Sequence, residues 1–298
     1  MTTVFDRDTE LTPAGPGRWS MAWSDEWRVA AGPNGGIVAA VMLAGCAAAV
    51  ADPSRAPRTL TVHYVAPPRV GPAEVHAQVE KAGRGVSFVT CRGVQEGRLT
   101  TLAMAAFAAP RPPVEEFAGL AAPSLPPPER CHRLLAEGRG GEEFPIRRRW
   151  DTRWAVGVER VLGGGGGGGG GGGRVEGGGW LRLSERRAYD PLLLAAMADG
   201  WMPPILAQAA PPPLRVPTME LTVHFRDLAA LAALDPADYC MAVFATDTSR
   251  EGFLEESGEI WSPCGRLLAQ SRQLAAIVPA PPGEERVALT LVAPEGQP

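Results

Sequence analysis

The chain has 298 residues, and its 29 Lys and Arg against 33 Asp and Glu give a formal net charge of −4 at pH 7. This length suits two units of about 100 to 150 residues rather than one minimal module. With 45% hydrophobic and 21% charged residues, the composition excludes a disordered chain, and the acidic balance offers no basic surface for nucleic acid.

The first long apolar segment, 37–51, is rich in alanine and predicts a buried helix over 35–51. It is shorter than the roughly 20 residues that a helix needs to cross a bilayer. The first residues, MTTVFDRDTELTP, carry acids and lack a basic segment followed by an apolar core. We therefore expect neither a secretory signal nor contact with a membrane.

Short apolar runs separated by Gly and Pro turn signals follow this helix and predict an antiparallel meander. The expected strands are 58–66, 73–82, 86–96 and 98–109.

A proline-rich segment from Pro110 to Pro128 can neither continue a helix nor pair as a central strand, so it predicts a connector. Further on, Gly163 to Gly173 is an unbroken glycine run that favours a flexible loop. The run could equally stand for residues of undetermined identity, and it indicates no chemistry.

The second half repeats the order of the first, with an apolar helix over 190–209 followed by strands. The expected strands are 215–226, 239–248, 253–261 and 266–278.

Two short matches support an internal repeat. LTVHY at 60–64 recurs as LTVHF at 221–225, and GRL at 97–99 recurs at 265–267. A helix that is small and apolar all round must be enclosed, and a curved antiparallel sheet supplies that burial. The sequence thus predicts an α+β tandem double hotdog. The expected domains are an N-terminal hotdog at 1–110, a connector at 111–143 and a C-terminal hotdog with the catalytic residues at 144–298.

The most unusual polar residue is Asp199, which lies in the apolar stretch LLLAAMADGWMPPIL. Burying an ionised carboxylate is costly, and such positions are common for functional acids. The alternative is that Asp199 and Gly200 only cap or kink the helix. Counted from the repeated GRL, Gln273 stands where the first half has Ala105, so polar groups gather in one copy.

Other chemistry finds little support. Four histidines and five scattered cysteines without a CxxC pair favour neither a metal site nor a disulfide framework, and no nucleotide-binding or nucleophile-elbow motif is present. We expect no metal or cofactor, and a reducing cytoplasm as the compartment.

At this point a family resemblance becomes visible. MADG on the second helix, PTMELTVHF on the next strand and LLAQSRQLA on the last resemble the C-terminal half of the acyl-CoA thioesterase II family. GPNGGIVAAVML and RTLTVHYVAPPRVGPAEV are similar to the N-terminal half of the thioesterase-like branch of that superfamily. The resemblance covers nearly the whole chain except the connector and the glycine run.

The resemblance implies a site in which an Asp, a Thr or Ser and a Gln hold the hydrolytic water. These roles correspond to Asp199, Thr218 and Gln273. Where the family has Asp-His-Ser after its hydroxyl residue, this chain has Glu220-Leu221-Thr222, so Thr222 competes with Thr218 for the hydroxyl role.

The expected substrate is a fatty acyl-CoA. The start of the first helix, Asn34-Gly35-Gly36, is a candidate for binding the thioester oxygen through its backbone N–H groups, and Trp201 is a candidate for lining the acyl tunnel. Each of these residues could instead serve packing alone. Outer strands leave room for a homo-oligomer, whereas acyl-chain length does not follow from the sequence.

Two other functions remain open at this stage. A non-catalytic acyl-CoA-binding protein could keep the same fold. A hotdog hydratase or dehydratase would require an acid–histidine pair; His224, on the strand that follows Asp199, is the candidate, although no histidine lies near the acid on its helix. The cluster Arg147-Arg148-Arg149 could contact CoA phosphates or simply form a solvated strand end.

Overall fold

The computed structural model describes residues 2–29, 32–134, 144–162, 174–208, 214–281 and 291–294. The glycine run Gly163–Gly173, for which the sequence predicts a loop, lies outside these residues, as do the last residues of the predicted connector.

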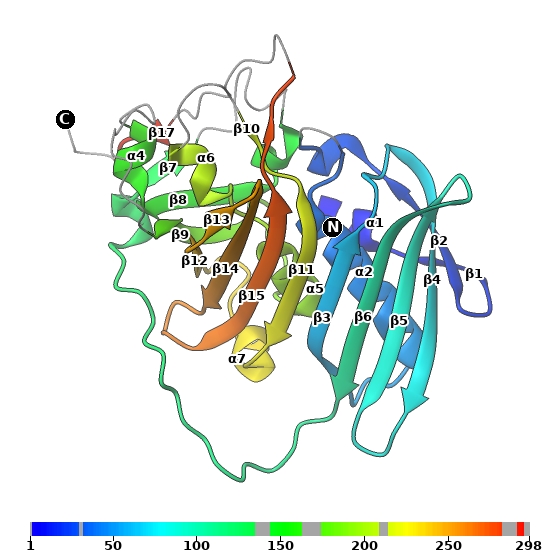
Figure 1. Ribbon diagram of the computed structural model, residues 1–298. Coiled ribbons are helices and arrows are strands. Elements are labelled where there is room, and N and C mark those ends of the chain that lie inside the picture. The colour runs from blue at the N-terminus through cyan, green and yellow to red at the C-terminus, as the bar shows by residue number, and fades with distance from the viewer. Residues whose placement is uncertain are drawn as a thin grey trace.

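The first half contains a helix enclosed on one side by a meander (Figure 1). The predicted helix and all four predicted strands are confirmed to within three residues at each end. The described elements are α1 (Val4–Thr9), β1 (Thr12–Gly15), β2 (Arg18–Trp23), the short 3-10 helix η1 (Asp25–Trp27), α2 (Gly35–Val50), β3 (Ala56–Tyr64), β4 (Gly71–Ala82), β5 (Ser87–Gln95) and β6 (Arg98–Ala108).

Helix α2 begins and ends where its sequence dictates. The side chain of Asn34 caps its start by accepting a hydrogen bond from the backbone N–H of Gly36, and Ala51 ends it in the left-handed conformation. Small residues allow the sheet to come close: a Cβ on Gly45 would lie 2.5 Å from Cγ1 of Val75 on β4. The helix is therefore buried, as its all-round apolar sequence requires.

The second half has the same helix-and-sheet organisation with more leading strands and short helices. Its described elements are η2 (Pro128–Arg130), β7 (His132–Leu134), η3 (Pro145–Arg148), β8 (Trp150–Val156), α4 (Val158–Leu162), β9 (Val175–Leu183), α5 (Pro191–Met197), α6 (Pro204–Gln208), β10 (Leu214–Arg215), β11 (Thr218–Phe225), α7 (Leu228–Ala232), β12 (Cys240–Thr246), β13 (Ser249–Arg250), β14 (Phe253–Trp261), β15 (Leu267–Ala276), β16 (Val278–Pro279) and β17 (Leu291–Val292).

The single helix predicted over 190–209 is wrong in one respect, because the structure divides it. Helix α5 ends at Met197 and α6 starts at Pro204, so Asp199 and Gly200 lie in the turn between them. Proline cannot donate a backbone hydrogen bond within a helix and clashes with the preceding turn, which explains the interruption before Pro203-Pro204.

The connector is extended and partly packed. It leaves β6 as a long chain without helix or strand (Figure 1) and then returns to the outer face of the second half. There Ala122 and Leu125 pack against a buried cluster on the outer face that includes Trp180 and Trp261, and Trp180 Nε1 donates to Pro126 O at 2.8 Å. The domain boundaries themselves stay a prediction.

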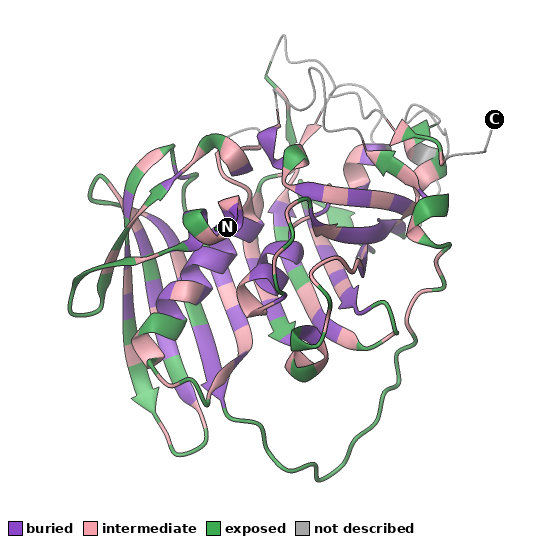
Figure 2. Ribbon diagram, turned by 180° about the vertical axis from the view of Figure 1, so that it is seen from behind, coloured by how far each residue is buried: buried purple, intermediate pink, exposed green. Residues whose placement is uncertain are grey.

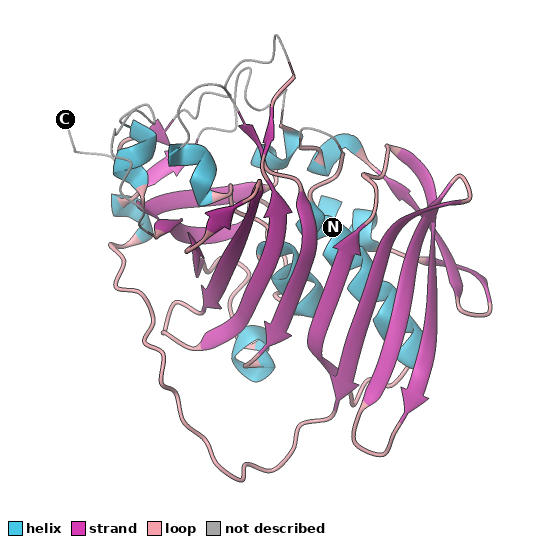
Figure 3. Cartoon of the chain, in the orientation of Figure 1, coloured by secondary structure: helices cyan, strands magenta, loops and turns pink. Residues whose placement is uncertain are grey.

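The two halves share one sheet (Figure 3). The described strands follow the order β1-β2-β4-β5-β6-β3 in the first half and β11-β15-β14-β12-β9-β8-β7-β17 in the second. Strands β3 and β11 pair antiparallel at the junction, from Glu220 opposite His63 to His224 opposite Thr59. The fold is a double hotdog, as the sequence predicts.

The register of the paired strands confirms that the second half repeats the first. Leu60 pairs with Ala105 across β3 and β6, and Leu221 pairs with Gln273 across β11 and β15. Each of these strand pairs also has a shift in register, at 57–59 in the first half and at 218–220 in the second, and these positions are equivalent in the repeat. Such bulges are local structural devices that redirect side chains.

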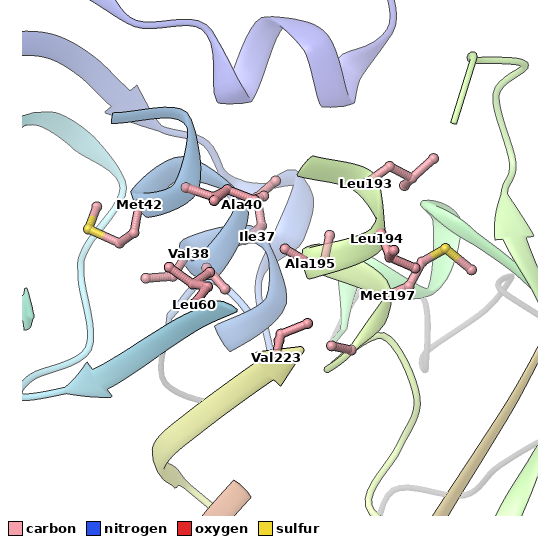
Figure 4. Close-up of a cluster of buried hydrophobic side chains, with 14 of the residues drawn as sticks. Ile37, Val38, Ala40, Met42, Leu60, Leu193, Leu194, Ala195, Met197 and Val223 are labelled. Atoms are coloured by element: carbon pink, nitrogen blue, oxygen red, sulfur yellow. The ribbon is translucent and has the colours of Figure 1, made fainter. Parts of the chain in front are cut away.

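The core lies between the inner face of the sheet and the two helices (Figure 2). Buried and more exposed residues alternate along β4 and β5, as expected for a sheet with one covered face, whereas β9 and β12 are buried along most of their length. Val223 and Leu60 meet at the β3–β11 junction beneath the helices. Figure 4 shows α2 contributing Ile37 and Val38 to this core while α5 contributes Leu194.

Candidate active site

Asp199 is held by the first half of the chain. Its side chain is only 8% exposed. Asn34 Nδ2 donates to Asp199 Oδ2 at 2.9 Å and to the main-chain oxygen of Asp199 at 2.9 Å. The start of α2 also touches the acid, because a Cβ on Gly35 would lie 2.7 Å from Asp199 Oδ2. The carboxyl thus faces the N-terminus of α2, where the helix dipole favours negative charge.

Burial raises the pKa of Asp199 to about 7. The backbone N–H of Gly36, the amide of Asn34 and the backbone N–H of Gly35 act in the opposite direction by stabilising the ionised form. The result is a buried acid that exchanges a proton near neutral pH. Such a group matches the requirement for a general base.

Gln273 and Thr218 lie together on the inner face of the sheet. Gln273 is only 3% exposed, and its Oε1 accepts a hydrogen bond from Thr218 Oγ1 at 3.3 Å. No direct hydrogen bond joins Asp199 to either residue within the described part of the chain. The structure therefore joins two members of the predicted trio directly and places the third at the end of α5.

Thr222, the alternative source of the hydroxyl, lies on the outer face of β11. Its Oγ1 interacts with Thr61 Oγ1 at 2.9 Å and donates to Glu220. Leu221, its neighbour, is the buried residue that pairs with Gln273. The geometry therefore favours Thr218 over Thr222 as the partner of the amide.

Sequence reasoning missed two further polar groups. Tyr64 donates from its hydroxyl to Gly35 O at 2.8 Å, and burial, with the charges of Asp199 and Glu220, raises the pKa of Tyr64 far above its usual value. Tyr64 differs from Phe225 at the end of the repeated LTVH motif, and that difference was the available signal.

The second missed group is Glu256 on β14, which is 4% exposed. Gln273 Nε2 donates to Glu256 Oε1 at 2.7 Å. Burial, followed by the nearby charge of Asp199, raises the pKa of Glu256 to about 8. The pattern FLEESGEIW alone does not identify it, because Glu255 and Glu259 are neighbours on the same strand.

Trp201 lies in the core close to the site. It is 6% exposed and packs against Trp154 with ring centroids 4.9 Å apart. Its Nε1 has no hydrogen-bond partner among the residues that the structure describes. This position agrees with a place beside an acyl chain and equally with a plain packing role.

His224 does not join the site, and Arg149 of the arginine cluster makes ion pairs elsewhere. His224 is exposed on β11 between the buried Val223 and Phe225, so it points away from the inner face where Asp199 lies. The acid–histidine pair of a hydratase is therefore not formed. In the cluster at 147–149, Arg149 makes ion pairs with Glu26 at 3.6 Å and Glu185 at 3.9 Å, which is a structural role.

Metal and membrane features can be tested over the described ranges. No group of three or more His, Cys, Asp or Glu residues in them could hold a metal ion. Likewise, none of the described helices has the length and apolar character required to span a bilayer.

A double hotdog with a buried acid at a helix N-terminus and an amide on the facing sheet is the arrangement that the sequence predicts for a hydrolase of thioesters. Family models give the relationship more narrowly: residues 23–108 match the acyl-CoA thioesterase N-terminal domain, and residues 128–277 match the acyl-CoA thioesterase C-terminal domain. Because these matches cover well over half of the chain, the chain belongs to the acyl-CoA thioesterase family.

Solved structures agree with this assignment. A hot dog fold protein of unknown function from Alicyclobacillus acidocaldarius superposes with a TM-score of 0.79 at 26% identity, covering 94% of this chain and 100% of that one. A candidate thioesterase II from Thermobifida fusca has a TM-score of 0.78 at 26% identity, covering 93% and 98%. An acyl-CoA thioesterase II from Mycobacterium marinum shares the fold, with a TM-score of 0.70 at 18% identity and coverage of 95% and 100%. No curated protein matches the sequence significantly.

Proposed function

We propose that the protein hydrolyses a fatty acyl-CoA to a free acid and CoA, with Asp199 as the general base. The observation that carries this proposal is the environment of Asp199, a buried carboxyl with a pKa of about 7 at the start of α2. A thioester is electrophilic and thiolate leaves readily, so the reaction needs mainly a positioned water and a base of this pKa.

In the proposed mechanism Asp199 accepts a proton from the attacking water. Thr218 and Gln273 hold that water, and their mutual hydrogen bond supports this joint role. The water oxygen forms a bond to the thioester carbon, and the tetrahedral intermediate then expels the CoA thiolate, which takes up a proton.

The start of α2 is the proposed place for the thioester oxygen. Partial positive charge at a helix N-terminus stabilises a developing oxyanion. Asn34 and Gly36 already hydrogen-bond each other, so their supporting role is to hold this helix end and Asp199 in place, while the missing side chain of Gly35 lets the Asp199 carboxyl approach the helix backbone closely. Trp201 is the proposed contact for the acyl chain beside the site.

We also propose the cytoplasm as the compartment and a homo-oligomer as a possible assembly. The five cysteines are free and widely separated in sequence, which suits a reducing environment. The outermost strands of the sheet could pair with a second copy.

The test is thiol release from a panel of acyl-CoAs of increasing chain length, measured against the Asp199→Asn variant. The expected result is saturable release of CoA by the native protein and a strong loss in the variant. Binding of acyl-CoA without release would instead identify a binding protein. Addition of water to an enoyl-CoA without thiol release would identify a hydratase.

A further inference from the structure

Glu256 occupies a polar position that has no counterpart in the first half. It pairs with Gln273 across β14 and β15, and Gln273 corresponds in register to Ala105, which pairs with Val89. Val89 is thus the first-half residue at the position of Glu256. A carboxyl that is 4% exposed where the other copy has valine requires a specific use.

The hydrogen bonds of Glu256 run through Gln273 to Thr218. Thr218 donates to Gln273 Oε1, and Gln273 Nε2 donates to Glu256 Oε1 at 2.7 Å. Without such contacts, a side-chain amide can rotate about its last bond, so that its oxygen and its NH2 group change places. The Thr218 hydroxyl as donor and Glu256 Oε1 as acceptor set the orientation of the Gln273 amide, and Glu256 keeps Oε1 as an acceptor in its neutral form when the proton is on Oε2.

The surroundings of Glu256 favour its neutral form. Its Oε2 is buried and has no hydrogen-bond partner among the described residues, so an anion there would be stabilised through Oε1 alone. Asp199 adds a negative charge from the end of α5, and burial with that charge raises the pKa of Glu256 to about 8.

Other groups around Glu256 do not compensate for an anion. Glu255, its neighbour on β14, also raises the pKa of Glu256 and is itself paired with Arg272 of β15 at 3.3 Å. On the other side of β14, the pairing with β12 ends at Ala245 opposite Ser257. The next residue of β12, Thr246, is buried and carries no charge.

We propose that Glu256 is a positioning residue of this active site: an uncharged acid that locks the Gln273 amide in the orientation that serves the attacking water. This inference rests on the proposed function. Ionisation of Glu256 places a second negative charge beside Asp199 and the developing oxyanion, so turnover falls when Glu256 loses its proton.

The pH profile of hydrolysis separates this role from simple packing. In the native enzyme kcat should rise as Asp199 ionises near pH 7 and should fall as Glu256 ionises near pH 8. The Glu256→Gln variant keeps an acceptor and a neutral side chain. It retains most of the activity at neutral pH, leaves the acid limb where it is, and loses the alkaline fall.

Two further variants sharpen the test. Glu256→Val installs the first-half residue and frees the amide, so kcat should fall by about 10-fold to 100-fold with little change in KM. Glu255→Gln removes a charge at the neighbouring position outside the hydrogen-bond chain, so it should keep a bell-shaped profile whose alkaline limb moves to lower pH, because Glu255 no longer raises the pKa of Glu256. An unchanged alkaline limb in Glu256→Gln, or native kcat in a folded Glu256→Val, overturns the proposal.

A readout without turnover distinguishes failure of this inference from failure of the proposed function. Infrared spectroscopy of the native protein should show a protonated carboxyl signal above pH 7 that is absent in Glu256→Gln. In Asp199→Asn the same signal should titrate at lower pH, because the neighbouring charge is gone. Absence of such a signal overturns the inference whatever the activity. Its presence in a protein without thiol release supports the neutral acid and rejects only the proposed hydrolysis.

Discussion

Asn34 and Asp199 are 165 residues apart in the chain, yet the amide of one donates to both the carboxylate and the main-chain oxygen of the other at 2.9 Å. The oxygen of the same amide caps α2 through Gly36. One side chain therefore fixes the acid of the second half against the helix of the first. The sequence places the predicted catalytic residues in the second half alone, whereas the structure holds Asp199 through residues of the first half as well.

Replacing Asp199 by Asn removes the proposed base while preserving size. We expect kcat/KM for a medium-chain acyl-CoA to fall by about 10²-fold or more, with KM nearly unchanged. Steady-state thiol release measures both parameters. Turnover close to that of the native protein would remove Asp199 from the mechanism.

Asn34→Ala withdraws a hydrogen bond from the ionised form of Asp199. The pKa of Asp199 should then rise above 7, by about one unit, so the acid limb of the activity profile moves to higher pH. Asn34→Asp keeps a capping oxygen but brings a like charge, and should move that limb further. If both variants kept the native acid limb, Asn34 would have no influence on the base.

Thr218→Val and Thr222→Val form a matched pair on one strand. Loss of the Thr218 hydroxyl releases Gln273 Oε1, and kcat should fall by about 3-fold to 10-fold. Thr222→Val should leave kcat unchanged and lower the free energy of unfolding by about 1 kcal/mol, because its bonds to Thr61 and Glu220 are lost. Thiol release and urea unfolding check the two; the opposite pattern would assign the hydroxyl role to Thr222.

Asp199 should also make the protein less stable as pH rises. Its pKa is about 7 in the folded chain and about 4 in the unfolded chain, so the folded state binds more protons between these values. The contribution of Asp199 to the free energy of unfolding is fully present below about pH 4, decreases between pH 4 and pH 7, and is lost above pH 7. The total loss is about 4 kcal/mol at most. Asp199→Asn should flatten this slope and raise Tm at pH 8. A variant with the native slope would contradict the burial of this charge.

Gly35→Ala tests how closely the helix approaches the acid. The added Cβ would lie 2.7 Å from Asp199 Oδ2 and 3.1 Å from the Tyr64 ring, so the carboxyl must move and kcat should fall by about 10-fold or more. Gly45→Ala, in the same helix but against Val75, should lower Tm and leave kcat of the folded protein intact. Equal kcat in the two variants would mean that Gly35 has no special role.

The elements that sequence patterns predicted are those governed by local rules. The helix at 35–51 and the strands that follow the apolar helix in each half were predicted from composition and turn residues, and the GRL repeat gave the correspondence of Gln273 with Ala105. The break after Met197 was harder to locate, because a turn and a helix differ little over a few apolar residues.

The choice between Thr218 and Thr222 depended on a feature that no sequence pattern revealed. In a regular strand both would share one face, since side chains alternate. The irregularity at 218–220 shifts the alternation by one residue, which brings Thr218 to the face of Leu221 and leaves Thr222 on the other. Tyr64 and Glu256 were also missed, because their hydrogen-bond partners lie elsewhere in the sequence: Gly35 at the start of α2 and Gln273 on the adjacent strand β15.

The continuous pairing of β3 with β11 has a consequence for the ancestry of the molecule. Two identical hotdog subunits joined along this edge would form a two-fold dimer with two equivalent catalytic centres. Covalent fusion removes the need for equivalence. The first copy can carry Pro57, Val89 and Ala105 where the second carries Thr218, Glu256 and Gln273, and it still presents a helix end to its neighbour. A division of labour of this kind is open to a tandem gene product and closed to a homodimer.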